Sequence, residues 1–109
     1  MQLKIAISDQ PGWTVLAPAG EVDLATVGQL EEAINGSING QNHIAIDLSA
    51  VTFMDSTGLR ALLTSHETMS SAGRRLALVV SGGPVNRLLD ISGVAQTLEI
   101  FTSLEAATA

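Results

Sequence analysis

The sequence has no cysteine, no tyrosine and only three aromatic side chains, Trp13, Phe53 and Phe101, among its 109 residues. The absence of cysteine excludes a disulfide framework and a thiolate metal site. So few aromatic rings leave no platform on which nucleic-acid bases could stack. Basic residues are also scarce: five lysines and arginines stand against eleven acidic residues, for a net charge of −6. This charge disfavours a nucleic-acid ligand, because affinity for nucleic acid comes largely from cations that meet phosphates.

Long hydrophobic runs are missing too. No apolar run approaches the ~18 residues of a membrane span, and the N-terminus lacks the apolar segment of a signal peptide. We therefore expect a cytoplasmic protein with no membrane partner. Hydrophobic residues nevertheless make up 46% of the chain and charged residues 15%, which argues against disorder. A chain of this length predicts one domain, residues 1–109, with one ordinary core.

Short apolar or alternating runs predict five strands. Residues 3–7 and 13–17 flank the turn residues Pro11 and Gly12, which predicts an N-terminal hairpin. The other three strands are expected at residues 43–48, 76–80 and 98–101. The first two of these are apolar almost throughout, which is typical of strands buried on both faces.

Apolar side chains spaced by three and four residues predict helices between the later strands. The clearest stripe begins at Leu59, and an earlier one begins at Leu24 with Asp23 as its N-cap. A capping box, Thr102 with Glu105, predicts a last short helix, although the final four residues should fray. The four expected helices cover residues 24–34, 59–72, 84–92 and those from 102 onward.

Strands that alternate with helices imply right-handed crossovers and a mostly parallel sheet, in which only the first strand runs antiparallel. In such a sheet the junctions from strand to helix lie at one edge, at the carboxyl ends of the parallel strands. That edge would collect Asp23, the pair Asp55 and Ser56, and the turn 81–83. Helix N-termini there add unpaired N–H groups and a positive dipole end, so the edge is suited to accept or reject a phosphate.

The run Phe53-Met54-Asp55-Ser56-Thr57-Gly58-Leu59 is the most informative part of this edge. It resembles the signature of STAS-domain anti-sigma-factor antagonists, or anti-anti-sigma factors. The run Gly20-Glu21-Val22-Asp23-Leu24 resembles the smaller motif of that family. The similarity covers nearly the whole chain, in order and in spacing. It implies an α/β, STAS-like single domain with a mostly parallel five-stranded mixed sheet, an N-terminal hairpin and about four helices.

The resemblance implies a partner-switching regulator of transcription rather than an enzyme. In that family, an anti-sigma factor that is itself a serine kinase phosphorylates the serine after the motif's aspartate, which is Ser56 here. The unmodified protein binds the kinase and frees its sigma factor, whereas the phosphorylated protein lets go. ATP would belong to the kinase, so no cofactor is expected in this chain, and a serine phosphatase would reset the switch. A monomer is the simplest expectation.

The first turn of the second helix, together with two acids, is the expected binding surface. Asp23 corresponds to the acid of the smaller motif, which helps to bind the partner in that family. Gly58 would allow a close approach of the partner's backbone. Arg60 stands where relatives often carry a small residue, which leaves the choice of partner open. The expected partner-binding residues are Asp23, Asp55, Ser56, Thr57, Gly58 and Leu59.

Phosphate on Ser56 would add a charge of about −1.5 to −2 beside two aspartates. At roughly 7 Å, and with an effective dielectric of about 20 to 80, each repulsion is on the order of 1–5 kcal/mol. The helix N-terminus would offset about 0.3–1 kcal/mol of this. A net change of a few kcal/mol alters affinity by a factor of tens to thousands, so one phosphate can end binding without refolding the domain.

Simpler roles are open for several of these residues. Ser56 and Asp23 could each be only a helix cap, and a structural role is favoured for Thr57 over a second phosphate acceptor. The turn 81–83 lacks the lysine and hydroxyl of a P-loop, so a plain turn is favoured there. His66 follows Ser56 by roughly 15 Å along a helix, which favours a packed core position over a catalytic triad. No cluster has metal-ligand spacing.

Two functions of other classes compete with the regulatory one. A transport-associated STAS subunit would share the fold and the edge but would need no phosphorylation. A small-molecule or nucleotide sensor would use the same edge and would need a sizeable pocket there. A hydrolase is disfavoured, because the nucleophile motif G-x-S-x-G is absent around Ser56.

Overall fold

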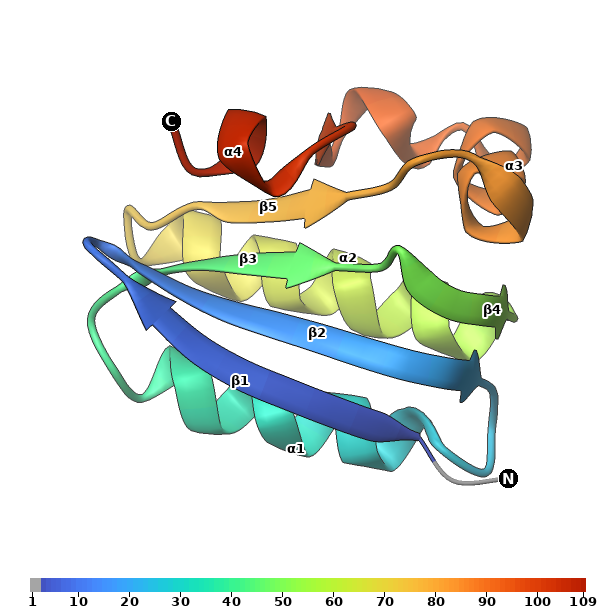
Figure 1. Cartoon of the computed structure of the whole chain (residues 1–109), viewed down its shortest axis with the longest axis horizontal. Coiled ribbons are helices and arrows are strands. Elements are labelled where there is room, and N and C mark those ends of the chain that lie inside the picture. Colours follow the sequence, from blue (N-terminus) through green and yellow to red (C-terminus); the bar gives the residue numbers. More distant parts are fainter. Residues whose placement is uncertain (1–2) are drawn as a thin grey trace.

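A sheet of six strands forms the centre of the computed structural model, which describes residues 3–109 (Figure 1). Its main path runs β1-β2-β3-β5-β6, and β4 pairs with β2 beyond the end of β3. The strands are β1 Lys4–Gln10, β2 Trp13–Val22, β3 His43–Asp47, β4 Ala50–Met54, β5 Leu76–Val79 and β6 Glu99–Phe101. The helices are α1 Val27–Ile38, α2 Ser56–Ser71, α3 Gly83–Ser92 and α4 Leu104–Ala107, with a 3-10 helix, η1, at Val94–Gln96.

The strand order confirms a mostly parallel mixed sheet with an N-terminal hairpin, in which the pair β1-β2 is antiparallel. The expected number of five strands is wrong, because β4 forms a sixth strand whose last two residues, Phe53 and Met54, begin the motif run. The cause is the length of β2, which has 10 residues and extends well past the expected range 13–17. Its second half offers a pairing edge that β3 does not reach, and β4 occupies that edge.

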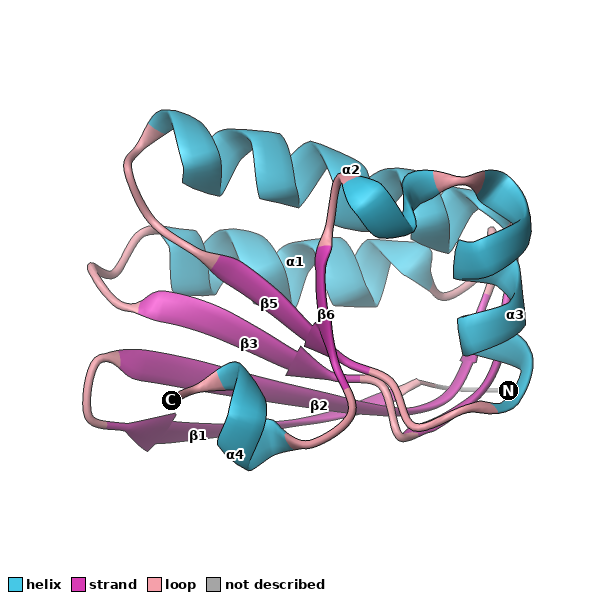
Figure 2. Cartoon of the chain, turned by 90° about the horizontal axis from the view of Figure 1, so that it is seen from above, coloured by secondary structure: helices cyan, strands magenta, loops and turns pink. Residues whose placement is uncertain are grey.

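Helices cover both faces of the sheet. α1 and α2 lie on one face and α4 lies on the other (Figure 2). The main core forms under α1 and α2, where Leu16 and Ile44 are among its fully buried side chains. A smaller cluster on the opposite face joins Trp13 and Val15 to Ala107 of α4. Ala107 has 0% exposure, so the expected fraying of the last four residues is wrong at this position.

α1 begins at Val27, later than the apolar stripe predicted. Leu24 therefore lies outside the helix and is 79% exposed. The reason is a turn over residues 23–26, in which the backbone N–H of Val27 already donates to the carbonyl oxygen of Asp23. Thr26 takes the N-cap position that the sequence assigned to Asp23.

The other helix ends agree with the positions that the sequence predicts or differ from them by a few residues. α1 continues to Ile38, which packs against the main core. α3 ends before Gly93 as predicted, and the φ of 74° at Gly93 is a conformation that suits glycine. α4 is capped by Ser103 and not by Thr102, because Ser103 Oγ accepts the backbone N–H of Ala106 at 3.1 Å. The short helix η1 was not predicted.

Arg74 ties the C-terminal end of α1 to the segment that leads into β3. Its Nη1 donates to the carbonyl oxygen of Ile38 at 2.7 Å, and its Nε donates to that of Asn42 at 3.0 Å. A cation suits this place, because the last carbonyl groups of a helix lack partners within the helix. The half-buried guanidinium therefore serves the fold and is not a free surface charge.

We predict that Arg74→Ala lowers the free energy of unfolding by about 2 kcal/mol, because it removes several charge-assisted hydrogen bonds. Urea unfolding at pH 7 measures this change. Arg87→Ala is the matched control, since Arg87 is exposed on α3, and it should change stability by less than about 0.5 kcal/mol. Equal losses in the two variants would contradict the role assigned to Arg74.

Candidate functional site

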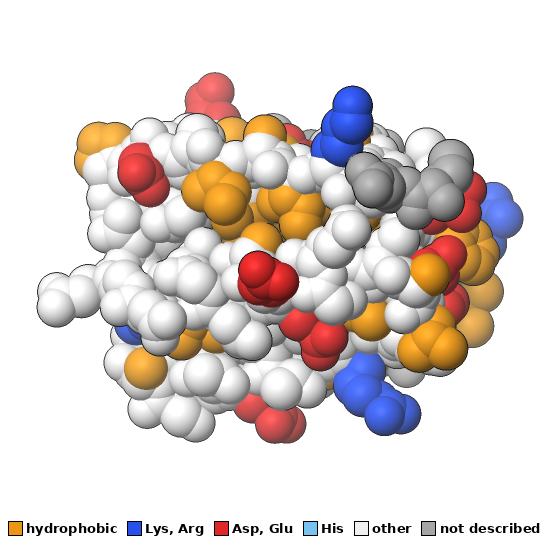
Figure 3. All heavy atoms as spheres, turned by 90° about the horizontal axis from the view of Figure 1, so that it is seen from below, with side chains coloured by type: hydrophobic (Ala, Val, Ile, Leu, Met, Phe, Trp, Pro, Cys, Tyr) orange, Lys and Arg blue, Asp and Glu red, His pale blue; other side chains and the backbone are white. Residues whose placement is uncertain are grey.

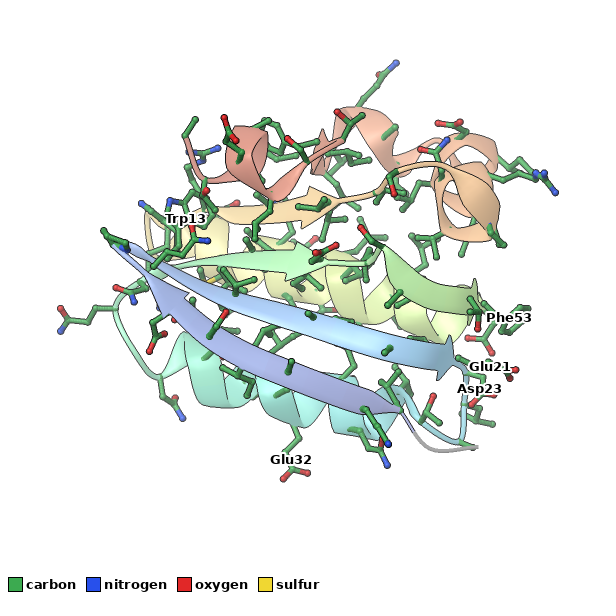
Figure 4. The ribbon with its side chains drawn as sticks, viewed as in Figure 1. Trp13, Glu21, Asp23, Glu32 and Phe53 are labelled. Carbon is green, nitrogen blue, oxygen red and sulfur yellow. The ribbon has the colours of Figure 1, made fainter. Side chains whose placement is uncertain are left out.

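Two neighbouring strands end together at the edge that carries the predicted site. Val22, the last residue of β2, is paired with Met54, the last residue of β4. The backbone N–H of Asp55 then donates to the carbonyl oxygen of Val22 at 3.1 Å. The segments that follow the two strands therefore start side by side, at one end of the molecule (Figure 4).

Asp55 is the N-cap of α2. Its Oδ1 accepts the backbone N–H of Thr57 at 2.9 Å and also the Thr57 hydroxyl. The hydroxyl bond holds the pKa of the Asp55 carboxyl below its ordinary value; partial burial opposes this, and the backbone N–H groups of Thr57, Gly58 and Leu24 reinforce it. Because Leu24 belongs to the segment after β2, this segment lies close to the Asp55 carboxyl.

Ser56 is the first residue of α2, and its side chain is exposed. Since Asp55 occupies the cap position, the alternative that Ser56 is only a helix cap is wrong. Within residues 3–109, no hydrogen bond engages the Ser56 hydroxyl. The site thus offers an accessible oxygen next to a carboxylate that is already held by its own hydrogen bonds.

Asp23 stabilises the turn that precedes α1. Its Oδ1 accepts the backbone N–H groups of Ala25 at 2.9 Å and Thr26 at 3.2 Å. Thr26 is 4% exposed, and its hydroxyl donates to the carbonyl oxygen of Glu21 at 2.7 Å. Asp23 is thus half-buried beside β2 and caps a turn rather than the helix itself. The structure does not test the expected contact of Asp23 with a partner, which stays a prediction.

Gly58 faces the interior, which overturns the reason for which it was expected at the binding surface. The residue is buried, and a Cβ placed on it would lie 2.7 Å from Met54 Cγ and 2.7 Å from Val22 Cγ1. The close approach that glycine permits is therefore between α2 and the ends of β2 and β4, not between the protein and a partner. Gly58 can contribute to binding only through the position that it gives to the helix.

The remaining predicted residues are less exposed than Ser56 and less buried than Gly58. Thr57 is half-buried and bonded to Asp55, as expected for a structural role. Leu59 is half-buried and packs against the main core. The structure therefore brings the predicted residues together at one edge, with Ser56 as the most open of them.

Two exposed apolar side chains belong to the same edge and were not predicted there. Leu24, next to Asp23, is 79% exposed, and Phe53 is 47% exposed. Phe53 is the register partner of Glu21 on β2, so a ring and an acid are neighbours across the two strands (Figure 4). Seen from below, hydrophobic and acidic side chains gather at this right-hand end of the molecule (Figure 3). The exposure of Phe53 could not be seen in the sequence, because its outward position follows from a register shift in β4.

A small hollow lies beside Ser56, between α1 and α2. Its volume is about 220 Å³. Ligand pockets typically measure about 300–1,000 Å³, so the hollow disfavours a small-molecule sensor that uses this edge. The lining residues are Val27, Glu31, Ser56, Thr57, Arg60, Ala61 and Thr64.

A larger open groove of about 670 Å³ lies elsewhere, between β1 and α1. Leu3, Ile5 and Ile7 line its sheet side, and Glu32 of α1 lies across from them. It shares no lining residue with the hollow beside Ser56. The space that a sensor would need is thus present in the protein but away from the predicted site.

Other residues that the sequence singled out have structural roles. Gly82 and Gly83 have φ values of 90° and 84° and form the tight turn before α3. His66 is half-buried on α2, which agrees with a packed position. Among residues 3–109, no three His, Asp or Glu side chains are grouped as metal ligands would be. No helix of this described part combines the length and the apolar character that crossing a membrane requires.

Comparison with known proteins agrees with the resemblance seen in the motif. Residues 4–107 match the STAS domain family. The chain is 35% identical over 107 residues to the anti-sigma-F factor antagonist RsfB of Mycobacterium tuberculosis, covering 96% of this chain and 86% of that protein. It is 29% identical to an anti-sigma F factor antagonist of Paenibacillus polymyxa, covering 93% and 88% of the two chains.

A solved structure supports the same assignment. The crystal structure of an anti-sigma factor antagonist from Mycobacterium paratuberculosis superposes with a TM-score of 0.91 at 28% identity. The superposition covers 97% of this chain and 91% of that one. The fold described above is thus shared with a solved protein of this kind.

We predict opposite effects for two glycine-to-alanine substitutions in helices. Gly58→Ala should destabilise the protein by about 1–3 kcal/mol, because its Cβ would overlap Met54 and Val22. Gly36→Ala in α1 should stabilise it by about 0.5–1 kcal/mol, because a Cβ there meets nothing within 4 Å. Urea unfolding of both variants measures the difference. If Gly58→Ala were as harmless as Gly36→Ala, α2 would not depend on this close approach.

The lowered pKa of Asp55 predicts a pH-dependent contribution to stability. Asp55→Ala should cost about 1 kcal/mol at pH 7, because the cap of α2 is lost. A carboxyl whose pKa is lower in the folded state stabilises above its ordinary value of 3.8 and loses this effect as the pH falls through the folded-state pKa. The gap between wild type and variant should therefore narrow towards pH 2, as measured by urea unfolding across this range.

Glu32→Gln is the control for the loss of one negative charge, since Glu32 is exposed on α1. It should change stability little across the same range. A gap for Asp55→Ala that stays constant down to pH 2 would show that the carboxylate charge does not stabilise the helix.

Proposed function

The chain belongs to the STAS domain family, and we propose that it acts as an anti-sigma-factor antagonist. The relatives from M. tuberculosis and P. polymyxa carry this function in their names and align over more than nine-tenths of the chain. In this role the protein binds an anti-sigma factor, and the sigma factor that was held by it becomes free. Such a protein works in the cytoplasm, where transcription takes place.

The exposed Ser56 hydroxyl is the observation that carries the finer mechanism. Ser56 opens α2, its side chain is accessible, and the neighbouring Asp55 already provides the helix cap. We infer that the anti-sigma factor is a serine kinase and that Ser56 is its target. The Ser56 oxygen attacks the γ-phosphorus of ATP held by the kinase, ADP leaves, and the hydroxyl proton is released. This chain is the substrate in that step, and a serine phosphatase reverses it.

Release follows from the charge that the phosphate adds. Unmodified Ser56 is neutral, whereas a phosphate carries about −1.5 to −2 charges. Asp55 is held ionised by its hydrogen bonds, so the new anion adds to an existing one. An interface that accommodates a hydroxyl would have to desolvate this phosphate, which costs more than the nearby helix N-terminus returns. The fold stays intact, because Ser56 is not part of the core.

The surroundings of Ser56 suit a protein surface as the partner. Leu24 and Phe53 expose apolar area of the kind that fills pockets on a partner. Acidic side chains lie close by, with Glu21 paired in register with Phe53 and Asp23 next to Leu24 (Figure 4). A partner with apolar pockets and cations around them would match this edge.

The competing functions fit these observations less well. A transport-associated STAS subunit would explain the fold, but it gives no reason for an accessible serine beside an ionised aspartate. A sensor of small molecules at this edge would have only the hollow of about 220 Å³ to use. The proposed antagonist uses the edge as a surface and needs no pocket.

We predict that purified wild-type protein, incubated with the serine-kinase anti-sigma factor of its own organism and ATP, gains one phosphate on Ser56. Mass-spectrometric mapping of the phosphopeptide detects it. Ser56→Ala should bind this kinase with nearly wild-type affinity, because only a hydroxyl is lost. Ser56→Asp should bind at least tenfold more weakly, because it places a charge at the interface. Calorimetric titration measures both affinities.

Ser8→Asp is the control for added charge, since Ser8 is exposed on β1 and lies outside the edge that carries the site. It should bind as wild type does. A phosphate found elsewhere, or equal binding by Ser56→Ala and Ser56→Asp, would overturn the assignment of Ser56.

A further inference from the structure

Arg60 is an unexplained cation beside the proposed phosphorylation site. It lies on α2 one helical turn after Ser56, and its side chain is exposed. Among residues 3–109, Arg75–Glu99 is the one ion pair, and no hydrogen bond engages the Arg60 guanidinium. Of the three other arginines, Arg74 and Arg75 are bonded, and Arg87 is exposed on α3 but does not line the hollow beside Ser56.

Arg60 and Ser56 share one surface. Residues four apart on a helix are neighbours on the same face, with about 5–6 Å between their Cβ atoms. Both side chains line the hollow between α1 and α2, together with Thr64, and Arg60 is the one basic residue of that lining. A group attached to the Ser56 oxygen therefore enters the space in which the Arg60 side chain lies.

We propose that Arg60 binds the phosphate of phosphorylated Ser56 and closes an ion pair along α2, an inference that rests on the proposed function for the modification itself. The guanidinium presents a planar fork of N–H donors that matches two phosphate oxygens. The same chain thus contains both the acceptor serine and the cation that receives its phosphate.

The acidic neighbours determine where the phosphate goes. Asp55 lies before Ser56, and its carboxylate is occupied by Thr57 and by backbone N–H groups, so it repels the phosphate and offers it no donor. Asp23 follows the neighbouring strand and adds a second negative charge at the same edge. Arg60 is the one basic residue among those that line the hollow beside Ser56, and the phosphate is directed towards it.

Glu31 of α1 is the competing anion inside the hollow. Its carboxylate does not come within 4.0 Å of the Arg60 guanidinium, since that pair is not among the ion pairs of residues 3–109. A phosphate with about two negative charges and three acceptor oxygens is the stronger partner for Arg60. Glu31 therefore weakens the capture by repulsion but does not prevent it.

The ion pair gives phosphorylation a second effect on the surface. The phosphate adds negative charge, and it also removes the exposed guanidinium from the set of groups that a partner can meet. A partner that pairs an acid with Arg60 in the unmodified state would lose that contact when Ser56 is phosphorylated. Release is then driven both by an added anion and by a withdrawn cation.

Phosphoserine placed at position 56 by genetic encoding tests this inference without any kinase or partner. A phosphorus-31 NMR titration gives the second pKa of the phosphate, which is ordinarily about 6. Arg60 should lower it, so that Arg60→Gln raises the phosphate pKa by roughly half a unit to one unit. Arg60→Lys should restore part of the shift, and Glu31→Gln should lower the pKa further.

Arg87→Gln is the matched control and should leave the phosphate pKa unchanged, since Arg87 is exposed on α3 and does not line the hollow. Circular dichroism verifies that each surface variant is folded. Equal phosphate pKa values in wild type and Arg60→Gln would overturn the capture of the phosphate by Arg60. That result would leave the proposed function intact, because the latter is tested separately by kinase modification and by binding of the Ser56 variants.

Discussion

The pairing of β4 with the end of β2 is the constraint on which the site depends. β2 continues past β3, β4 adds to its free edge, and the ladder closes with the Asp55 N–H bonded to the Val22 carbonyl. This arrangement fixes where α2 begins and places the turn after β2 beside it. Without it, Asp23 and Asp55 would follow separate strands with no contact between their segments. This pairing also brings the backbone N–H of Leu24 close enough to the Asp55 carboxyl to help lower its pKa.

The pairing of β4 with β2 also separates two kinds of residue in the motif. Some stabilise the start of α2, and one is exposed and open to modification. Asp55 and Thr57 are engaged with each other and with backbone N–H groups, which fixes the first turn of α2. Ser56 lies between them in sequence but points its side chain to solvent and carries none of these bonds. A covalent change at Ser56 can therefore alter the surface charge while the cap of α2 remains in place, as a reversible modification requires.

Much of the fold could be predicted from the sequence, because strong local patterns coincide with tertiary packing. The hairpin around Pro11 and Gly12, the buried strands β3 and β5, and the periodic helix α2 follow from such patterns. The start of α1 could not be predicted, because the turn held by Asp23 and Thr26 displaces an apolar stripe that fits a helix equally well. β4 could not be predicted either, since it becomes a strand only where a neighbouring strand is long enough to pair with it. That the segments with Asp23 and Asp55 follow neighbouring strands at one edge was predictable from topology, whereas the exposure of Phe53 depends on a register shift in β4.

Gly58 shows how a buried residue of the motif determines where the exposed residues of α2 lie. At this residue α2 passes so close to Val22 and Met54 that a Cβ has no room, so Gly58 helps to set the distance of the helix from the ends of β2 and β4. That distance in turn sets the hollow that Ser56 and Arg60 line against α1. A larger residue at position 58 would push the first turn of α2 outward and move the serine and the arginine together. Gly58 thus affects binding through the position that it gives to α2, although it presents no surface of its own. This explains why a buried glycine and an exposed serine occur in one short run of sequence.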